Sequence, residues 1–276
     1  MDRRGLDRFR SNLSAELRYA AEMADDARAD GVLLGYSVLV GLTPLIPLPF
    51  VDDAARGYLM RRMVRAIAEA HALKLWEEEV RELADERSVS VVKGMFRGLA
   101  LLPIKLVLRK AIFLLTGKRI VDLVSEIYHR GFLLDRAFAN GWCSPHGEAK
   151  ARDLRVAMDA LLVETPVTTS PVTAALRVGF ERSRDALGRA LTTLRARFSP
   201  GASAGEVDRK IDQTVEQAAS DEASGLGSIV AELRRALTAV PREHFDALEK
   251  RLGERLGITQ KERQKDALGQ GAAADG

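Results

Sequence analysis

The feature that most constrains this chain is a run of 21 residues without a charge, GVLLGYSVLVGLTPLIPLPFV, between Asp30 and Asp52. Its length matches the roughly 20 apolar residues that a helix needs to cross a bilayer. Its second half, however, contains Pro44, Pro47 and Pro49. Each proline removes a backbone donor and restricts the residue before it. The run therefore argues against one straight spanning helix.

We expect instead an apolar helix over about 31–42, an extended elbow at the three prolines, and a new helix that opens at Asp52 or Asp53. Either carboxylate can accept hydrogen bonds from the free N–H groups of a helix start, and its charge suits the positive end of the helix dipole. This second helix is expected to continue to about residue 86.

The remaining sequence also predicts helices. Ala, Leu, Arg and Glu recur while aromatic residues make up only 5%, and straight side chains lose little freedom in a helix. Ser170 followed by Pro171 is typical of a helix start. Apolar residues three or four apart predict helices over 5–29, 120–138, 148–162 and 172–198, and three more within 207–258. The predicted fold class is an all-α multi-helix bundle with an apolar, proline-punctuated hairpin and a small C-terminal helical module.

The best domain boundary is the segment SPGASAGE at 199–206, where small, flexible residues replace the periodic apolar ones. It predicts a linker between a helical domain over 1–198 and a helical module over 207–258. The composition of the segment 259–276 turns to Gln, Lys, Gly and Ala, which predicts a disordered tail.

A second apolar stretch, 91–116, is interrupted by five cations: Lys93, Arg97, Lys105, Arg109 and Lys110. Each cation near the centre of a bilayer costs about 2.5–3.5 kcal/mol, so a simple span is expensive. Two interpretations remain: a solvated face on a core helix, or attachment to anionic lipid with apolar neighbours inserted below the charges. The residues between the cations are Leu, Ile, Phe and Val, which argues against nucleic acid as a partner.

Motifs that carry chemistry are missing from the sequence. Gly117-Lys118 lacks the glycine and the hydroxyl residue of a phosphate-binding loop. A single cysteine, Cys143, excludes an intramolecular disulfide. The four histidines, His71, His129, His146 and His244, are scattered and form no pair at helical spacing. We therefore predict no catalytic residue, no metal ligand and no cofactor.

The stretch GLTPLIPLPFVDDAARGYLMRRMVRAIAEAHAL resembles the YcjF-like bacterial domain of unknown function that is associated with membrane-linked GTPases. The resemblance covers about 31–138 and lies in the apolar helix, the three prolines, the two aspartates and the Met- and Ala-rich helix after them. It implies a helical, membrane-associated module that works beside a GTPase. This sequence departs from that context because it contains no GTPase domain.

The favoured hypothesis is a non-enzymatic, membrane-associated scaffold or accessory factor at the cytoplasmic face of the inner membrane. In it, Val38, Leu39 and the five cations contact the membrane surface or bilayer, and 207–258 offers a protein-docking surface. The alternative is a soluble, cytoplasmic all-α protein-interaction module with a fully buried core. A third hypothesis is an enzyme acting on an apolar substrate, which requires a pocket with converging polar groups. The first two are distinguished by whether other helices cover Val32, Leu33, Val38 and Leu39.

Overall fold

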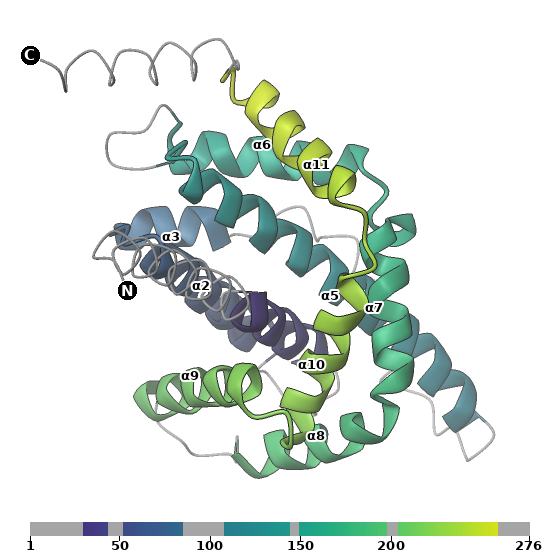
Figure 1. Cartoon of the computed structure of the whole chain (residues 1–276). Helices are drawn as coiled ribbons and strands as arrows, with labels where there is room; N and C mark the ends of the chain where they lie inside the picture. The colour runs from purple at the N-terminus through teal and green to yellow at the C-terminus, as the bar shows by residue number, and fades with distance from the viewer. Residues whose placement is uncertain (1–29, 44–51, 85–107, 144–148, 198–203, 259–276) are drawn as a thin grey trace, which may run out of the picture.

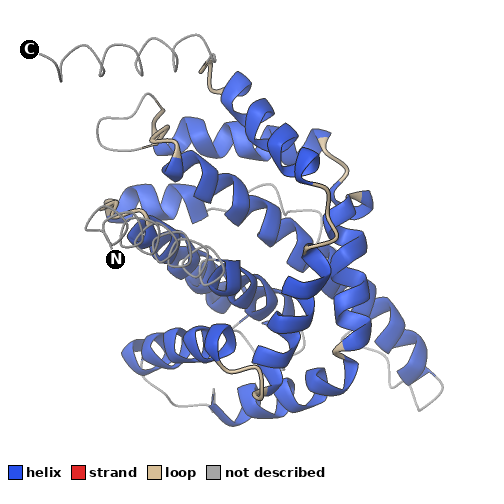
Figure 2. Ribbon diagram, in the orientation of Figure 1, coloured by secondary structure: helices blue, strands red, loops and turns tan. Residues whose placement is uncertain are grey.

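The computed structural model describes residues 30–43, 52–84, 108–143, 149–197 and 204–258. Within these ranges the fold is all-α and contains no strand (Figure 2), which confirms the predicted fold class. A helix over 30–42, which we name the central helix, carries no label in Figure 1. The labelled elements are α2 (Asp52–Ala70), α3 (Glu77–Ala84), α5 (Leu108–Ala139), α6 (Ala151–Glu164), the 3-10 helix η4 (Val167–Thr169), α7 (Pro171–Arg182), α8 (Arg184–Arg197), α9 (Ala204–Ser220), α10 (Gly225–Leu237) and α11 (Arg242–Arg255).

The central helix lies inside the bundle, with α6 and α11 on one side of it and α8 and α9 on the other (Figure 1). Other helices approach it closely. A methyl group placed on Gly35 would lie 3.2 Å from the Val215 side chain of α9, and one placed on Gly41 would overlap Val124 of α5. The Tyr36 hydroxyl donates a hydrogen bond to Asp212 of α9 at 3.3 Å. Small residues thus let α5 and α9 enclose the most apolar segment of the chain.

Burial of the central helix corrects the hypothesis that Val38 and Leu39 contact lipid. Val38 is 0% exposed and Leu39 4% exposed, and both belong to the hydrophobic core. Leu33 is 6% exposed and Val32 is partly buried. An uncharged run satisfies a protein core as readily as a bilayer, because both remove apolar side chains from water. Over the described ranges, no helix combines the length and hydropathy that crossing a membrane requires.

The three helices after the predicted linker share one core with the rest of the chain. That core runs from Leu33 to Ile258. α9 packs on the central helix, α10 on α7 and α8, and α11 on α6 and α5. α9 begins at Ala204, inside the predicted linker, and residues 198–203 lie outside the described part. Each of these three helices thus packs on a helix that precedes the predicted linker, and α9 and α10 also pack on each other.

Several predicted helix boundaries were wrong. The helix expected over 52–86 begins at Asp52 but stops at Ala70, and α3 starts afresh at Glu77. Ala72 has a φ of 54°, which ends α2, and the Glu79 carboxylate accepts a hydrogen bond from the Trp76 N–H at 2.7 Å. This carboxylate satisfies an N–H that a helix start otherwise leaves free.

The other two boundary errors concern α5 and the pair α7 and α8. α5 begins at Leu108 and continues through Gly117, whereas the helix was expected only over 120–138. One interior glycine costs only about 1 kcal/mol and does not end a helix. The helix expected over 172–198 divides at Ser183, which is buried and whose N–H bonds the Gly179 carbonyl. This division lets α10 pack against both α7 and α8.

Candidate binding site

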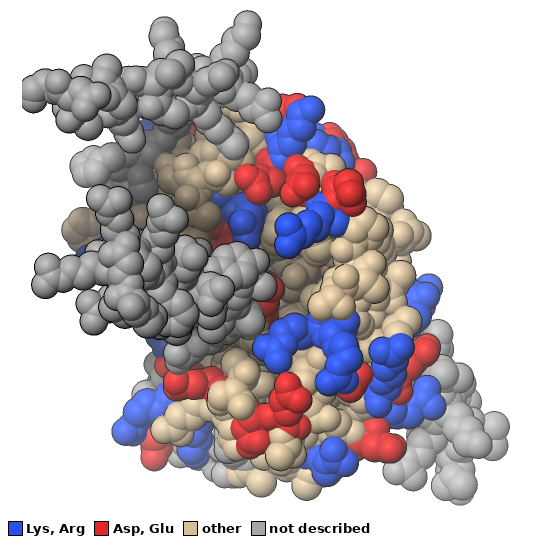
Figure 3. Space-filling model, in the orientation of Figure 1, with Lys and Arg blue, Asp and Glu red and all other residues tan. Residues whose placement is uncertain are grey.

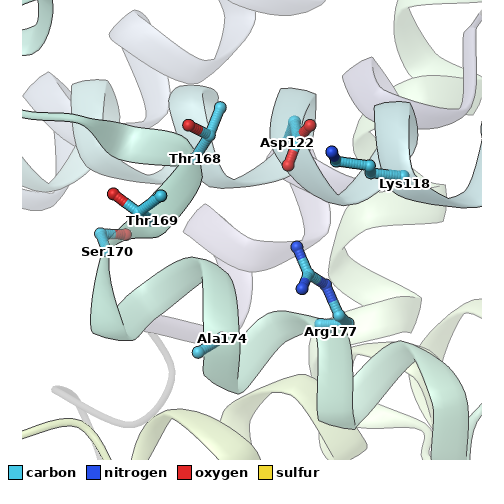
Figure 4. Close-up of a pocket in the computed structure, with 7 residues that line it drawn as sticks. All are labelled: Lys118, Asp122, Thr168, Thr169, Ser170, Ala174 and Arg177. Atoms are coloured by element: carbon cyan, nitrogen blue, oxygen red, sulfur yellow. The ribbon is translucent and has the colours of Figure 1, made fainter.

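A polar cleft of about 470 Å³ lies between α5 and α7. Figure 4 shows Lys118 and Asp122 reaching into it from α5 and Arg177 reaching up from α7, with the η4 turn at the far side. The lining residues are Lys118, Asp122, Thr168, Thr169, Ser170, Ala174 and Arg177. Three charged groups and three hydroxyl groups therefore surround one space.

Local sequence explains how the elements hold these side chains. Lys118 and Asp122 are four residues apart, so they share one face of α5. Ser170 is the N-cap of α7 and its Oγ accepts a hydrogen bond from the Thr173 N–H at 3.1 Å, with Pro171 in the first turn. The sequence prediction of this helix start is confirmed. This helix start places Thr168 and Thr169 of η4 immediately before α7, and Arg177 lies further along α7.

The charges in the cleft do not cancel by direct contact. Burial raises the pKa of Asp122, and the positive charges of Lys118 and Arg177 partly oppose this rise. Within the described part of the chain, Asp122 Oδ1 is buried and lacks a hydrogen-bond partner. A buried carboxylate oxygen without a donor costs free energy. The cleft therefore combines two cations with a carboxylate that lacks a donor.

The hydroxyl groups differ in what they can still donate. Thr169 donates to the Pro166 carbonyl at 3.1 Å, so its only proton is used. Thr173, directly behind the cleft, donates to the Val167 carbonyl, and Ser125 therefore donates to Thr173 Oγ1 at 2.6 Å. No such bond engages the Thr168 hydroxyl among the described residues. It is the donor that remains for a molecule in the cleft.

Behind the cleft, a buried polar chain continues to two histidines. His129 Nδ1 lies 2.7 Å from the Ser125 carbonyl, and a carbonyl only accepts, so Nδ1 carries the proton. His129 Nε2 then accepts from His244 Nε2 at 3.4 Å. Burial lowers the pKa of His129 to about 4, and the neighbouring His244 adds to this effect while the Ser125 bond opposes it. Both histidine side chains are therefore uncharged at neutral pH, and their hydrogen bond connects α5 to α11.

Two side chains that serve as nucleophiles in other proteins, Ser125 and Cys143, are buried here. Ser125, the serine nearest to His129, is 0% exposed, so no substrate reaches it. Burial raises the pKa of Cys143 to about 11, which keeps this thiol protonated and unreactive. No group of three or more possible metal ligands occurs in the ranges that the structure covers.

The residues that the sequence singled out lie elsewhere. α2 begins at Asp52, in agreement with the predicted helix start. The side chains of Asp52 and Asp53 lie outside the part of the chain that the structure describes. Arg109 and Lys110 belong to the first turns of α5, and the structure does not describe their side chains either. The remaining predicted site residues, Pro44, Pro47, Pro49, Lys93, Arg97 and Lys105, lie beyond the described residues.

Sequence reasoning missed the cleft because its two sides are far apart in the chain. Lys118 and Asp122 precede Arg177 by more than fifty positions, and each is an ordinary surface charge on its own helix. Only the Ser170-Pro171 pair gave a local signal.

Comparison of the chain with protein-family models, with curated proteins and with solved structures gave no match. The resemblance to the YcjF-like domain stays a prediction.

Proposed function

We propose that this chain is a non-enzymatic helical protein that acts by binding another protein and uses its most apolar helix as its own core. The observation that carries the proposal is the enclosure of the central helix, where Leu33, Val38 and Leu39 are only 6%, 0% and 4% exposed. These side chains distinguish the interaction hypothesis from the membrane hypothesis. Their burial supports the former.

The surface best suited to a partner is a groove of about 420 Å³ between α6 and α11, which we name the α6–α11 groove. Its lining is Ala149, Arg152, Asp153, Val156, Ala157, Ala160, Arg255 and Leu256. Val156 is 52% exposed, and Val163, two turns further along α6, is 80% exposed. Residues seven apart share one helix face, so α6 presents an uncovered apolar stripe beside the groove.

The chemistry of this groove fits an amphipathic helix of a partner protein. Such a helix places apolar side chains into a groove at spacings of about one and two turns. Val156, Ala160 and Leu256 supply the apolar centre, while Arg152 and Arg255 supply a charged rim, as in ordinary protein interfaces. On the face shown in Figure 3, basic and acidic side chains are intermixed, a pattern more typical of protein binding than of nucleic-acid binding. The predicted partner segment, 207–258, contributes through α11.

A second candidate is peripheral attachment to an anionic membrane through the segment 91–116. The supporting observation is that the first turns of α5 project beyond the rest of the bundle (Figure 1). This projecting end includes Arg109 and Lys110 and the apolar run AIFLL. Each cation close to an anionic surface contributes on the order of 1 kcal/mol.

Fractionation of cells that express a tagged copy separates the two candidates. We expect the full chain to remain in the supernatant after membranes are sedimented, because its central helix is covered. Sedimentation reversed by high salt would instead favour the second candidate. In that case, replacing all five cations of 91–116 with glutamine must abolish sedimentation. Replacing five exposed arginines outside the α6–α11 groove must not abolish it: Arg182, Arg184, Arg189, Arg235 and Arg242. Release by detergent alone would contradict both candidates.

Charge introduced on the exposed stripe of α6 tests the proposed surface. We expect the double variant Val156→Glu, Val163→Glu to reduce recovery of a specific partner at least tenfold, because a buried charge without a counter-ion is costly in an interface. Quantitative mass spectrometry after cross-linking in cells measures this. The matched control is Val178→Glu on α7, which is 43% exposed and outside the groove. Equal partner profiles for the double variant and the unmodified chain would contradict the α6–α11 groove as the docking surface.

A further inference from the structure

Two cations of the cleft between α5 and α7 form no ion pair within the described residues. Lys118 and Arg177 approach the same space from different helices (Figure 4). Both act on Asp122 through their charge, but within the described residues neither forms an ion pair with it or with another carboxylate. Two like charges that share a cleft repel each other, and an anion between them removes that repulsion. A ligand with at least one strongly charged oxyanion group fits this side of the cleft.

Asp122 adds a second requirement. One of its carboxylate oxygens is buried and has no hydrogen-bond donor in the described part of the chain. Its other oxygen, Oδ2, is not buried in this way and accepts no hydrogen bond within the described residues, so it is open to a molecule in the cleft. A ligand hydroxyl beside the oxyanion can donate a hydrogen bond to Oδ2, and a hydrogen bond to an ionised carboxylate is among the stronger ones. An anion without a hydroxyl group would be attracted by the two cations but repelled by Asp122, so it should bind less tightly.

We propose that this cleft binds a small phosphorylated polyol. Lys118 and Arg177 bind the phosphate, the Thr168 hydroxyl donates a hydrogen bond to it, and Asp122 accepts a hydrogen bond from a neighbouring hydroxyl of the ligand. The doubly charged phosphate matches two cations better than a singly charged carboxylate does. The volume of about 470 Å³ lies within the range of small-molecule sites. This site is separate from the α6–α11 groove and does not depend on it.

Titration calorimetry on the full chain with three probes tests the site. We expect glycerol 3-phosphate to bind more tightly than inorganic phosphate, because only the former offers hydroxyl donors to Asp122. Glycerol alone should not bind measurably, since it lacks the charge that Lys118 and Arg177 require. Absence of binding by both glycerol 3-phosphate and inorganic phosphate at millimolar concentration would overturn the proposal.

Variants of the lining residues assign the roles. Arg177→Gln and Lys118→Gln should each weaken glycerol 3-phosphate binding by about tenfold or more, which is the usual loss for a charge-assisted hydrogen bond. The matched control is Arg182→Gln, an exposed arginine on α7 outside the cleft, which should change affinity less than twofold. Equal losses for Arg177→Gln and Arg182→Gln would show only general charge attraction and overturn the site.

The variant Asp122→Ala distinguishes the contribution of the ligand hydroxyl to binding from that of the phosphate. It should tighten inorganic phosphate, because a repelling charge is gone, and reduce the preference for glycerol 3-phosphate by about tenfold, because the acceptor for its hydroxyl is gone. An unchanged preference for glycerol 3-phosphate over inorganic phosphate would overturn the role given to Asp122. Circular dichroism and Tm without ligand verify that each variant folds.

The same glycerol phosphate group occurs in a lipid headgroup. If the phosphate comes from a lipid, phosphatidylglycerol vesicles should compete with glycerol 3-phosphate for the cleft. This competition should be lost in Arg177→Gln and kept in Arg182→Gln. Binding of glycerol 3-phosphate without such competition would assign the phosphate to a free metabolite. Both results support the cleft.

Discussion

Replacement of Asp159 by alanine is expected to lower the free energy of unfolding by about 3–5 kcal/mol. Asp159 of α6 accepts a hydrogen bond from Arg130 of α5 at 2.6 Å, and the Arg130 side chain is only 2% exposed. The same carboxylate lies 3.6 Å from Arg155, which also donates to Glu82 of α3 at 3.0 Å. One carboxylate thus serves two cations, and its removal takes the Asp159 ion pair away from the buried Arg130 guanidinium.

Urea unfolding followed by circular dichroism measures this loss. Asp159→Asn should cost less than Asp159→Ala, because its amide oxygen can still accept the hydrogen bond from Arg130. Glu82→Ala is the matched control, since it removes a carboxylate from the same network but leaves Arg155 beside Asp159. A cost for Asp159→Ala of under about 1 kcal/mol, the usual value of a surface ion pair, would show that the network is not structurally important.

Acidification from pH 7.5 to pH 5 is expected to destabilise the fold by about 2 kcal/mol through His129 alone. Burial lowers the pKa of His129 to about 4 in the folded state, whereas an unfolded histidine has a pKa of about 6.5. Above pH 7 neither state binds the proton, so His129 makes no difference there. Between about pH 6.5 and pH 4 the unfolded state binds more protons, and stability therefore falls as the pH falls.

Unfolding midpoints across this pH range test the expectation. His129→Gln removes the titrating group and should flatten the dependence between pH 7.5 and pH 5, although His244, whose pKa burial also lowers, leaves a smaller slope. Carboxylates with ordinary or lowered pKa values titrate mainly below this window and contribute little to it. Parallel curves for the unmodified chain and His129→Gln would show that His129 is not buried in its neutral form.

The sequence predicted the fold class because helix signals are local. Apolar residues three or four apart, the Ser170-Pro171 start and the start at Asp52 all depend on neighbours within one or two turns. The breaks at His71 and at Ser183 were missed because neither position carries a glycine or proline. Ala72 adopts a positive φ that its residue type does not announce, so only packing explains the turn.

The environment of the central helix could not be predicted from the sequence for a different reason. Residues 31–43 would show the same uncharged pattern whether they met lipid or protein. The choice depends on Val215 and Ala219 of α9 and Val124 of α5, which approach the central helix at its glycines. The cleft was missed for the same reason, since Asp122 and Arg177 meet only after α5 and α7 have packed.

The enclosure of the central helix also determines when the fold can close. Tyr36 bonds Asp212, 176 positions later in the chain, and Arg62 of α2 bonds the same carboxylate at 2.9 Å. On the ribosome, the nascent central helix therefore waits for α9 to emerge before its last apolar side is covered. A nascent chain that exposes such a surface for long is prone to aggregate. We therefore expect a chain truncated before α9 to aggregate more readily than the full chain.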